Sequence, residues 1–112
     1  MSRRVRIREP KDHERTLGEL MYWGRVKNNL TQTELADQIG ATQKYISLIE
    51  RNRDGGVKSI SLDKLVQAYT ILGVSLDVVY FKLGMLPPDI MDALRDNWPL
   101  YHGILRAVRG DE

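Results

Sequence analysis

The chain has 112 residues, of which 42% are hydrophobic and 29% charged, so it can build one modest core but not two independent ones. It contains no cysteine and no apolar run long enough to cross a bilayer, and its formal net charge is only +2. These features argue against a disulfide-stabilised fold and a membrane protein. We expect a cytoplasmic location, because no secretory signal opens the sequence.

Residues 1–15 are predicted to form a basic, flexible N-terminal arm. They carry six Lys or Arg against three acidic residues, with one proline and little apolar content. Residues 85–112 have the opposite balance, with three basic residues against five acidic ones. Because a charged terminus is commonly a solvated tail, this asymmetry alone gives weak support for an anionic partner.

Helical signals begin directly after the arm. Thr16 with Glu19, and Thr31 with Glu34, have the spacing of capping boxes, so they are expected to begin the first and second helices. Gly40 follows the second helix at a place where a left-handed backbone favours a sharp turn. The sequence therefore predicts two helices joined to a third by a very short connection.

The third helix is expected to begin after Thr42, with Ile46 and Ile49 facing inward. A polar, glycine-rich loop, "RNRDGGVKSI", follows it. Ser61 and Ser75 are expected to cap a fourth and a fifth helix, the fifth ending near residue 84. The inward face of the fourth helix is expected to hold Leu62, Leu65, Val66, Tyr69 and Leu72.

Residues 85–112 are predicted to form two further short helices, the first started by two prolines and ended by Trp98–Pro99. Each has an apolar side but too little depth to bury it unaided, so the pair must pack on its own domain or on a second copy. We expect the second copy, which makes this segment a dimerisation segment. The expected dimer contacts are Ile90, Leu94, Trp98, Ile104, Leu105 and Val108.

The third helix has an outward side suited to DNA. With Ile46 and Ile49 inward, the opposite arc is mostly polar, lacks acidic residues and holds Gln43, Lys44, Ser47, Leu48 and Arg51. Glutamine can pair with adenine and lysine with guanine in the major groove, while the start of the second helix can direct N–H groups at a phosphate. Any small bundle has polar outward faces. The combination of this polar arc with the start of the second helix and the short connection between them nevertheless predicts a helix-turn-helix.

The sequence resembles the Cro and phage-repressor type (Xre-like) helix-turn-helix family through "LTQTELADQIGATQKYISLIERN" followed by "SISLDKLVQAYTILGVSLDVVY". The resemblance covers about residues 16–83. It implies an all-α, five-helix repressor-type bundle over residues 16–84, followed here by the short C-terminal pair. It also implies a sequence-specific double-stranded DNA-binding transcriptional regulator, which we expect to be a homodimeric repressor. An antitoxin or a protein-interaction adaptor using the same fold is the alternative.

Carried over by position, the resemblance implies that Gln32 binds a phosphate and can brace Gln43, and that Arg25 and Glu50 form a structural ion pair. Leu48 stands where this family often has a polar or basic residue, so it could touch a thymine methyl group or be idle. The expected base contacts are Gln43, Lys44, Ser47 and Leu48. The expected phosphate contacts are Thr31, Gln32, Thr42, Tyr45, Arg51, Arg53, Lys58 and Ser59, although the Tyr45 ring could equally pack on the second helix.

Catalysis is not expected. His13 and His102 are far apart in sequence, and there is no glycine-rich phosphate loop or metal-ligand spacing. We therefore expect no cofactor and no metal. The expected partners are double-stranded DNA and a second copy of the chain, while an antirepressor, a protease or a toxin as a further partner is left open.

Overall fold

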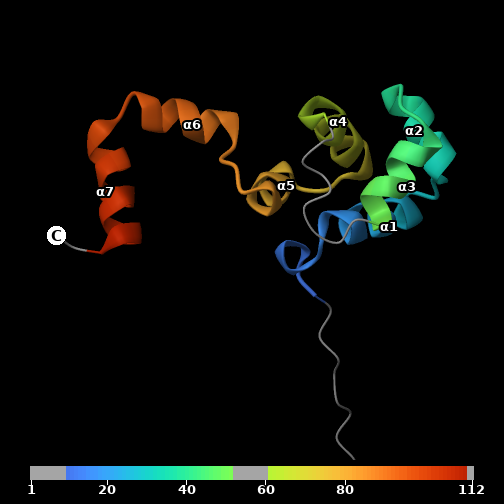
Figure 1. Cartoon of the computed structure of the whole chain (residues 1–112), viewed down its shortest axis with the longest axis horizontal. Helices are drawn as coiled ribbons and strands as arrows, with labels where there is room; N and C mark the ends of the chain where they lie inside the picture. The colour runs from blue at the N-terminus through green and yellow to red at the C-terminus, as the bar shows by residue number, and fades with distance from the viewer. Residues whose placement is uncertain (1–9, 52–60, 111–112) are drawn as a thin grey trace, which may run out of the picture.

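The computed structural model describes residues 10–51 and 61–110 and contains helices but no strand within these ranges (Figure 1). This confirms the all-α prediction of five helices followed by a C-terminal pair. Most of the predicted arm, together with Arg53, Lys58 and Ser59, lies outside the described residues. The helices are η1 (Asp12–Glu14, a 3-10 helix), α1 (Leu17–Lys27), α2 (Gln32–Ile39), α3 (Gln43–Arg51), α4 (Leu62–Leu72), α5 (Leu76–Leu83), α6 (Pro88–Arg95) and α7 (Trp98–Arg109).

Both predicted capping boxes are present and fix where α1 and α2 begin. The Thr16 hydroxyl accepts a hydrogen bond from the Glu19 backbone at 3.0 Å, and the Thr31 hydroxyl accepts one from Glu34 at the same distance. The backbone and side chain of Thr31 lower the pKa of Glu34 by hydrogen bonding to it. At the other end of α2, Gly40 has the expected left-handed backbone, with φ +67°.

Two details of the later helices differ from the prediction. Ser61 and Ser75 do precede α4 and α5, but neither side chain makes a capping hydrogen bond. Instead, their backbone carbonyls accept the first helical bonds, from the N–H groups of Leu65 and Val79. Leu62, expected inward, is 36% exposed because it is the first residue of α4 and lies at the edge of the bundle.

The core lies between α1, α2, α3 and α4, with α5 against α4 (Figure 1). The Tyr69 hydroxyl enters this core and donates a hydrogen bond of 2.6 Å to the Leu17 carbonyl, and burial raises the pKa of Tyr69 well above its usual value. This bond ties α4 to the start of α1. The largest fully buried side chains are Tyr69, Met21, Leu35, Ile46, Ile49, Leu65 and Val79.

We expect Tyr69→Phe to lower the free energy of unfolding by about 0.5–1.5 kcal/mol, since it removes the buried hydrogen bond that joins α4 to the start of α1. Urea denaturation followed by circular dichroism measures the change. Tyr101→Phe is the matched control, because Tyr101 is 43% exposed, and it should change the stability by less than about 0.5 kcal/mol. Equal effects of the two substitutions would contradict the role assigned to this hydrogen bond.

The C-terminal helices α6 and α7 extend away from the core and pack on each other (Figure 1). The prediction that Trp98–Pro99 ends the first helix is wrong, because α6 ends at Arg95 and Trp98 is the first residue of α7. Asn97 caps α7, accepting a hydrogen bond of 3.1 Å from the Leu100 backbone. Pro99 is tolerated there because the N–H groups of a first helical turn need no helical partner.

Part of the segment predicted to be a flexible arm is ordered. Its residues 12–14 form η1, which lies against α5. The Lys82 ammonium donates to the His13 carbonyl at 3.2 Å, and the rings of His13 and Phe81 meet edge to face at 6.4 Å. The contacts that order residues 12–14 come from α5, so the local composition of the arm did not reveal them.

Candidate nucleic-acid interface

Hydrogen bonds within the turn between α2 and α3 fix the orientation of the two helices relative to each other. The Ala41 N–H donates to the Ala36 carbonyl at 2.8 Å, and the Thr42 hydroxyl accepts from the Tyr45 N–H at 3.2 Å at the start of α3. Ile46 and Ile49 are both fully buried and anchor one side of α3 in the core. The opposite side of α3 therefore faces solvent.

That outward side carries all four residues predicted to contact bases. Gln43, Lys44 and Leu48 are exposed, Leu48 by 41%, and Ser47 is half-buried between them. Within residues 43–51, all of them described, no acidic side chain interrupts this surface, since Glu50 points inward and its side chain is only 7% exposed. The arrangement leaves a protruding surface with one amide and one ammonium group in its first turn.

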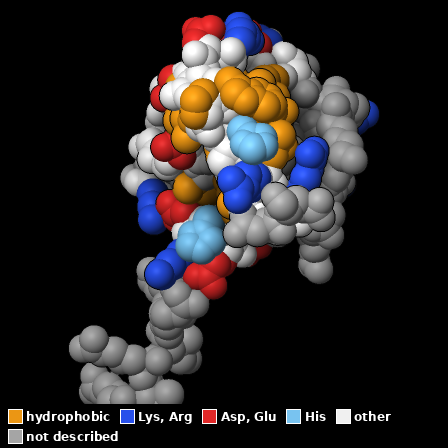
Figure 2. Space-filling model, turned by 90° about the vertical axis from the view of Figure 1, so that its left-hand side faces the viewer, with side chains coloured by type: hydrophobic (Ala, Val, Ile, Leu, Met, Phe, Trp, Pro, Cys, Tyr) orange, Lys and Arg blue, Asp and Glu red, His pale blue; other side chains and the backbone are white. Residues whose placement is uncertain are grey.

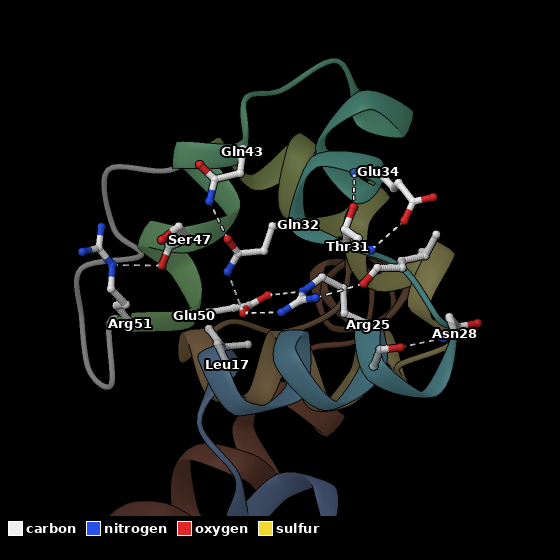
Figure 3. Close-up of polar contacts among 12 residues, drawn as sticks. Leu17, Arg25, Asn28, Thr31, Gln32, Glu34, Gln43, Ser47, Glu50 and Arg51 are labelled. Carbon is white, nitrogen blue, oxygen red and sulfur yellow. Dashed lines mark hydrogen bonds and ion pairs between the residues drawn. The ribbon is translucent and has the colours of Figure 1, made fainter.

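Behind this surface, a chain of polar contacts connects Gln43 to α1 (Figure 3). The Gln43 amide donates to Gln32 at 2.6 Å, and the Gln32 amide donates to Glu50 at 3.0 Å. Arg25 then pairs with both carboxylate oxygens of Glu50, at 2.6 and 2.9 Å, and donates to the Leu30 carbonyl at 2.9 Å. The Arg25–Glu50 ion pair and the bracing of Gln43 by Gln32, both implied by the resemblance, are therefore present.

The contacts from Gln43 through Gln32 and Glu50 to Arg25 are called the relay below. The chemistry of Glu50 decides which group donates and which accepts at each step of the relay. A carboxylate only accepts hydrogen bonds, so Gln32 must turn its NH₂ group to Glu50 and its oxygen to Gln43. Gln43 in turn donates one N–H to that oxygen, so its own oxygen and its second N–H remain available to bind another molecule. The bond to Glu50 also raises the pKa of Arg25, whose side chain is 13% exposed, so the guanidinium stays charged.

Tyr45, predicted as a phosphate contact with packing of its ring on the second helix as the alternative, has a buried hydroxyl. Its ring packs against the core, and its hydroxyl is buried with no hydrogen-bond partner among the described residues. Burial raises its pKa to about 12. A phosphate outside the protein has no access to this oxygen, so we remove Tyr45 from the predicted phosphate contacts.

The start of α2 borders the same surface. Thr31 is exposed, while its own N–H is bound by the Glu34 carboxylate at 2.9 Å. The N–H groups of the following first turn point outward, as at any helix start. Arg51 is exposed at the end of α3, and its guanidinium donates weakly to the Ser47 carbonyl at 3.4 Å. Thr42, also exposed, completes the predicted phosphate contacts that the structure describes.

An open trough on the α1 side of this surface was missed by the sequence reasoning. Tyr22 and Trp23 line it together with Gln32 and Arg51, and each aromatic residue is 45% exposed. The Arg25 guanidinium lies 5.5 Å from the centre of the Tyr22 ring. Tyr22 and Trp23 directly follow Met21, which is buried in α1. Because Met21 was expected to face inward, its two neighbours could have been expected at the exposed edge of the helix.

Two short helices joined by a tight turn, with the second presenting an anchored polar side to solvent, define a helix-turn-helix protein. Residues 21–79, more than half of the chain, match the family model described as helix-turn-helix. The chain therefore belongs to this helix-turn-helix family, which is non-enzymatic, in agreement with the expectation that it is not an enzyme.

Two relatives support the same assignment. Both are named uncharacterized HTH-type transcriptional regulators, from Mycobacterium tuberculosis strains CDC 1551 / Oshkosh and ATCC 25618 / H37Rv. Each is 32% identical over 68 residues, which are 61% of this chain and 46% of the relative, so the match spans less than half the length of those proteins. No solved structure gives a significant match.

Two further observations concern other kinds of site. Among the described residues, no group of three or more His, Asp and Glu side chains is placed to hold a metal ion. None of the described helices has the length and apolar character needed to span a membrane.

Proposed function

We propose that the chain is a sequence-specific double-stranded DNA-binding transcriptional regulator, and that it acts as a homodimeric repressor in the cytoplasm. The observation that carries this proposal is the relay that holds Gln43 on the outward side of α3. A side chain braced in one orientation loses little freedom on binding and can discriminate between partners. In this proposal, α3 lies in the major groove.

The relay supports a specific base preference for Gln43. Its remaining oxygen and N–H present one acceptor and one donor, which match the N6 donor and the N7 acceptor of adenine. Lys44 offers only donors, and these match the O6 and N7 acceptors of guanine. We assign Ser47 and Leu48 to further base contacts in the same groove, Leu48 to a thymine methyl group.

Phosphate binding would come from the edges of this surface. We assign it to Thr31 and Gln32 at the start of α2, to Thr42 at the turn and to Arg51 at the end of α3, all of which lie around the exposed side of α3. The first-turn N–H groups and the positive end of the α2 dipole favour an anion there. Arg53, Lys58 and Ser59 remain proposed phosphate contacts outside the described residues.

Dimerisation would double the number of base pairs that a single α3 helix can contact. Two copies related by a two-fold axis bind a site whose half-sites are separated by about one helical turn, roughly 34 Å. Occupation of a promoter by such a dimer excludes other proteins, which is the simplest mechanism of repression. The two relatives are named transcriptional regulators, which supports the regulatory part of this proposal.

Selection of bound sequences from random duplex DNA tests the proposed function. Gln43→Ala is expected to lower affinity for the best site by about 1–3 kcal/mol and to remove the preference at one base pair of each half-site, an adenine; Lys44→Ala should do the same at a guanine. Gln38→Ala is the matched control, since Gln38 is exposed on α2 and has no part in the relay. It should return the parental consensus.

If the Gln43 and Lys44 variants both return the parental consensus with undiminished affinity, α3 is not the helix that recognises bases. The adaptor alternative would then replace DNA recognition. Repeating the binding measurement between low and physiological salt separates the phosphate contribution, because each phosphate contact steepens the loss of affinity with salt.

A further inference from the structure

The exposed apolar side of α6 and α7 is the surface that the proposed homodimer would use. Figure 2 shows hydrophobic side chains gathered on the face where α7 lies. Leu94 is removed from the expected dimer contacts, because it is already buried within one chain, at 8% exposure. Leu105 is half-buried, and the remaining expected contacts are exposed: Ile90, Trp98, Ile104 and Val108. A second exposed apolar surface, on α1, is not accounted for by dimerisation.

This second surface is the open trough between α1 and the end of α3. Its aromatic wall consists of Tyr22 and Trp23, whose rings meet edge to face at 5.2 Å and are each 45% exposed. Gly18, one turn before Tyr22, also lines the trough and lets the backbone of Ile49 and Glu50 approach α1 closely. The rings are therefore held by a helix that is fixed against α3, so they lose little freedom when a partner covers them.

Two positive charges lie at this aromatic wall without a full partner in the chain. The half-buried Arg15 places its guanidinium 5.8 Å from the centre of the Trp23 ring and has no carboxylate partner among the residues that the structure describes. Arg51, which lines the trough, makes only the long hydrogen bond of 3.4 Å to the Ser47 carbonyl. An arginine that stacks on an aromatic ring can still bind an anion through its N–H groups.

The two acidic residues that line the trough do not cancel these charges. Glu50 is paired with Arg25 through both carboxylate oxygens, at 2.6 and 2.9 Å. The Glu19 carboxylate accepts a hydrogen bond of 3.1 Å from the Thr16 backbone as part of the capping box. Within the described part of the chain, the three arginines in and beside the trough outnumber its two glutamates by one. The trough therefore combines an apolar wall with a surplus of positive charge.

The trough is continuous with the proposed DNA surface. Gln32 and Arg51 line it, and both are assigned above to phosphates of the DNA that α3 recognises. A strand bound by both residues would run along the trough. Such a strand alternates anionic phosphates with deoxyribose rings, whose C–H edges are apolar. Arginines beside exposed aromatic rings match this alternation, because each chemical group of the strand meets a complementary group of the protein.

We propose that the trough binds the sugar–phosphate backbone of one strand of duplex DNA, with the Tyr22 and Trp23 rings against deoxyribose and Arg15 on a neighbouring phosphate. This inference rests on the proposed DNA-binding function and adds residues of α1 to its interface. Contacts to sugar and phosphate carry no sequence information directly, but they fix the register and orientation of a protein on the duplex. In this arrangement α1 fixes the orientation in which α3 enters the major groove.

The aromatic contact can be tested by measuring the affinity of the full-length protein for two duplexes, the sequence recovered by selection and a scrambled version of it. Trp23→Ala and Tyr22→Ala should each weaken binding to both duplexes about fivefold, because apolar contact with a sugar does not depend on sequence. The selected consensus should stay the same. Phe81→Ala is the matched control, since it truncates an aromatic side chain that is 64% exposed on α5, and it should bind both duplexes as the parent does.

Salt dependence separates Arg15 from the rings. Arg15→Gln removes one phosphate contact from each copy, so the slope of log affinity against log salt should become less steep by about 2 in the dimer. Trp23→Ala should lower the affinity without changing this slope. Arg95→Gln is the control, because the Arg95 side chain is 71% exposed on α6, and it should leave the slope unchanged.

Tryptophan fluorescence reports on the trough without truncating it. In Trp98→Phe, Trp23 is the only tryptophan of the chain. Saturation with the selected duplex should reduce the acrylamide quenching of Trp23 about twofold, because a ring covered by a partner is shielded from a quencher in the solvent.

Two outcomes would overturn the proposal, and they differ in what else they affect. A parent protein that binds no duplex DNA would overturn both the proposed function and this role of the trough. The second outcome is a parent that binds the selected duplex while both alanine variants keep its affinity, Arg15→Gln keeps its salt slope and Trp23 keeps its quenching. That result would overturn only the role of the trough, and α3 would still recognise DNA with the trough facing away from it.

Discussion

Glu50→Gln is expected to lower the free energy of unfolding by about 3 kcal/mol, because it leaves the Arg25 guanidinium without its counter-charge in a site where the side chain is only 13% exposed. The substitution keeps the shape of the residue and removes its charge. It also loosens the relay, since a glutamine at position 50 can donate as well as accept and no longer dictates the orientation of Gln32. DNA recognition should therefore become less selective at the base assigned to Gln43.

Urea denaturation measures the stability change, with Asp37→Asn as the control. Asp37 is an exposed acid on α2, so the same loss of charge there should change the stability by less than about 0.5 kcal/mol. Arg25→Met combined with Glu50→Leu should recover much of the stability that Glu50→Gln loses, because no buried charge is left. If Glu50→Gln were as stable as the parent, the ion pair would contribute nothing to holding α1 against α3.

Gly18→Ala is expected to destabilise the protein by about 3 kcal/mol, the upper end of the usual cost of adding a methyl group to a packed site. A Cβ atom at Gly18 would lie 2.7 Å from the backbone carbonyl oxygens of both Ile49 and Glu50. Backbone atoms cannot rotate away as a flexible side chain can, so α1 and the end of α3 would have to separate. The same shift would disturb the ion pair between Arg25 and Glu50.

Gly103→Ala provides a matched control within another helix. Apart from the adjacent residues and backbone of α7 itself, no described atom lies within 4 Å of a Cβ at Gly103, so alanine should instead stabilise the protein by about 0.5–1 kcal/mol through the lower entropy of its unfolded chain. Both variants can be compared by urea denaturation at one protein concentration. Opposite signs are the expected result, and a stabilising effect of Gly18→Ala would contradict the close approach of α1 to α3.

Local signals in the sequence were enough to predict the helix-turn-helix. The Thr31 and Glu34 capping box, the left-handed Gly40 and the inward Ile46 and Ile49 are each encoded within a few residues, and all are present. The pairing of Arg25 with Glu50 spans 25 positions, and it was reached through the resemblance to a known family.

Features that depend on distant packing were not predictable from one sequence. Nothing near Gly18 indicates that two carbonyl groups of α3 face it. Tyr45 lies next to the outward arc on a helical wheel, and only the tertiary structure shows that its hydroxyl points inward. The extension of α6 and α7 away from the core is likewise invisible in a pattern that shows only that each helix has an apolar side.

The relay has a consequence for how this protein could acquire a new operator, by evolution or in a library. Gln43 is joined through Gln32 to the Arg25–Glu50 pair. A new residue at position 43 would therefore change base preference but also remove one hydrogen bond from this chain of contacts. Lys44 and Leu48 protrude from α3 and are not part of that chain. Under the proposed function, variation at positions 44 and 48 would therefore change the DNA target while it leaves the relay intact.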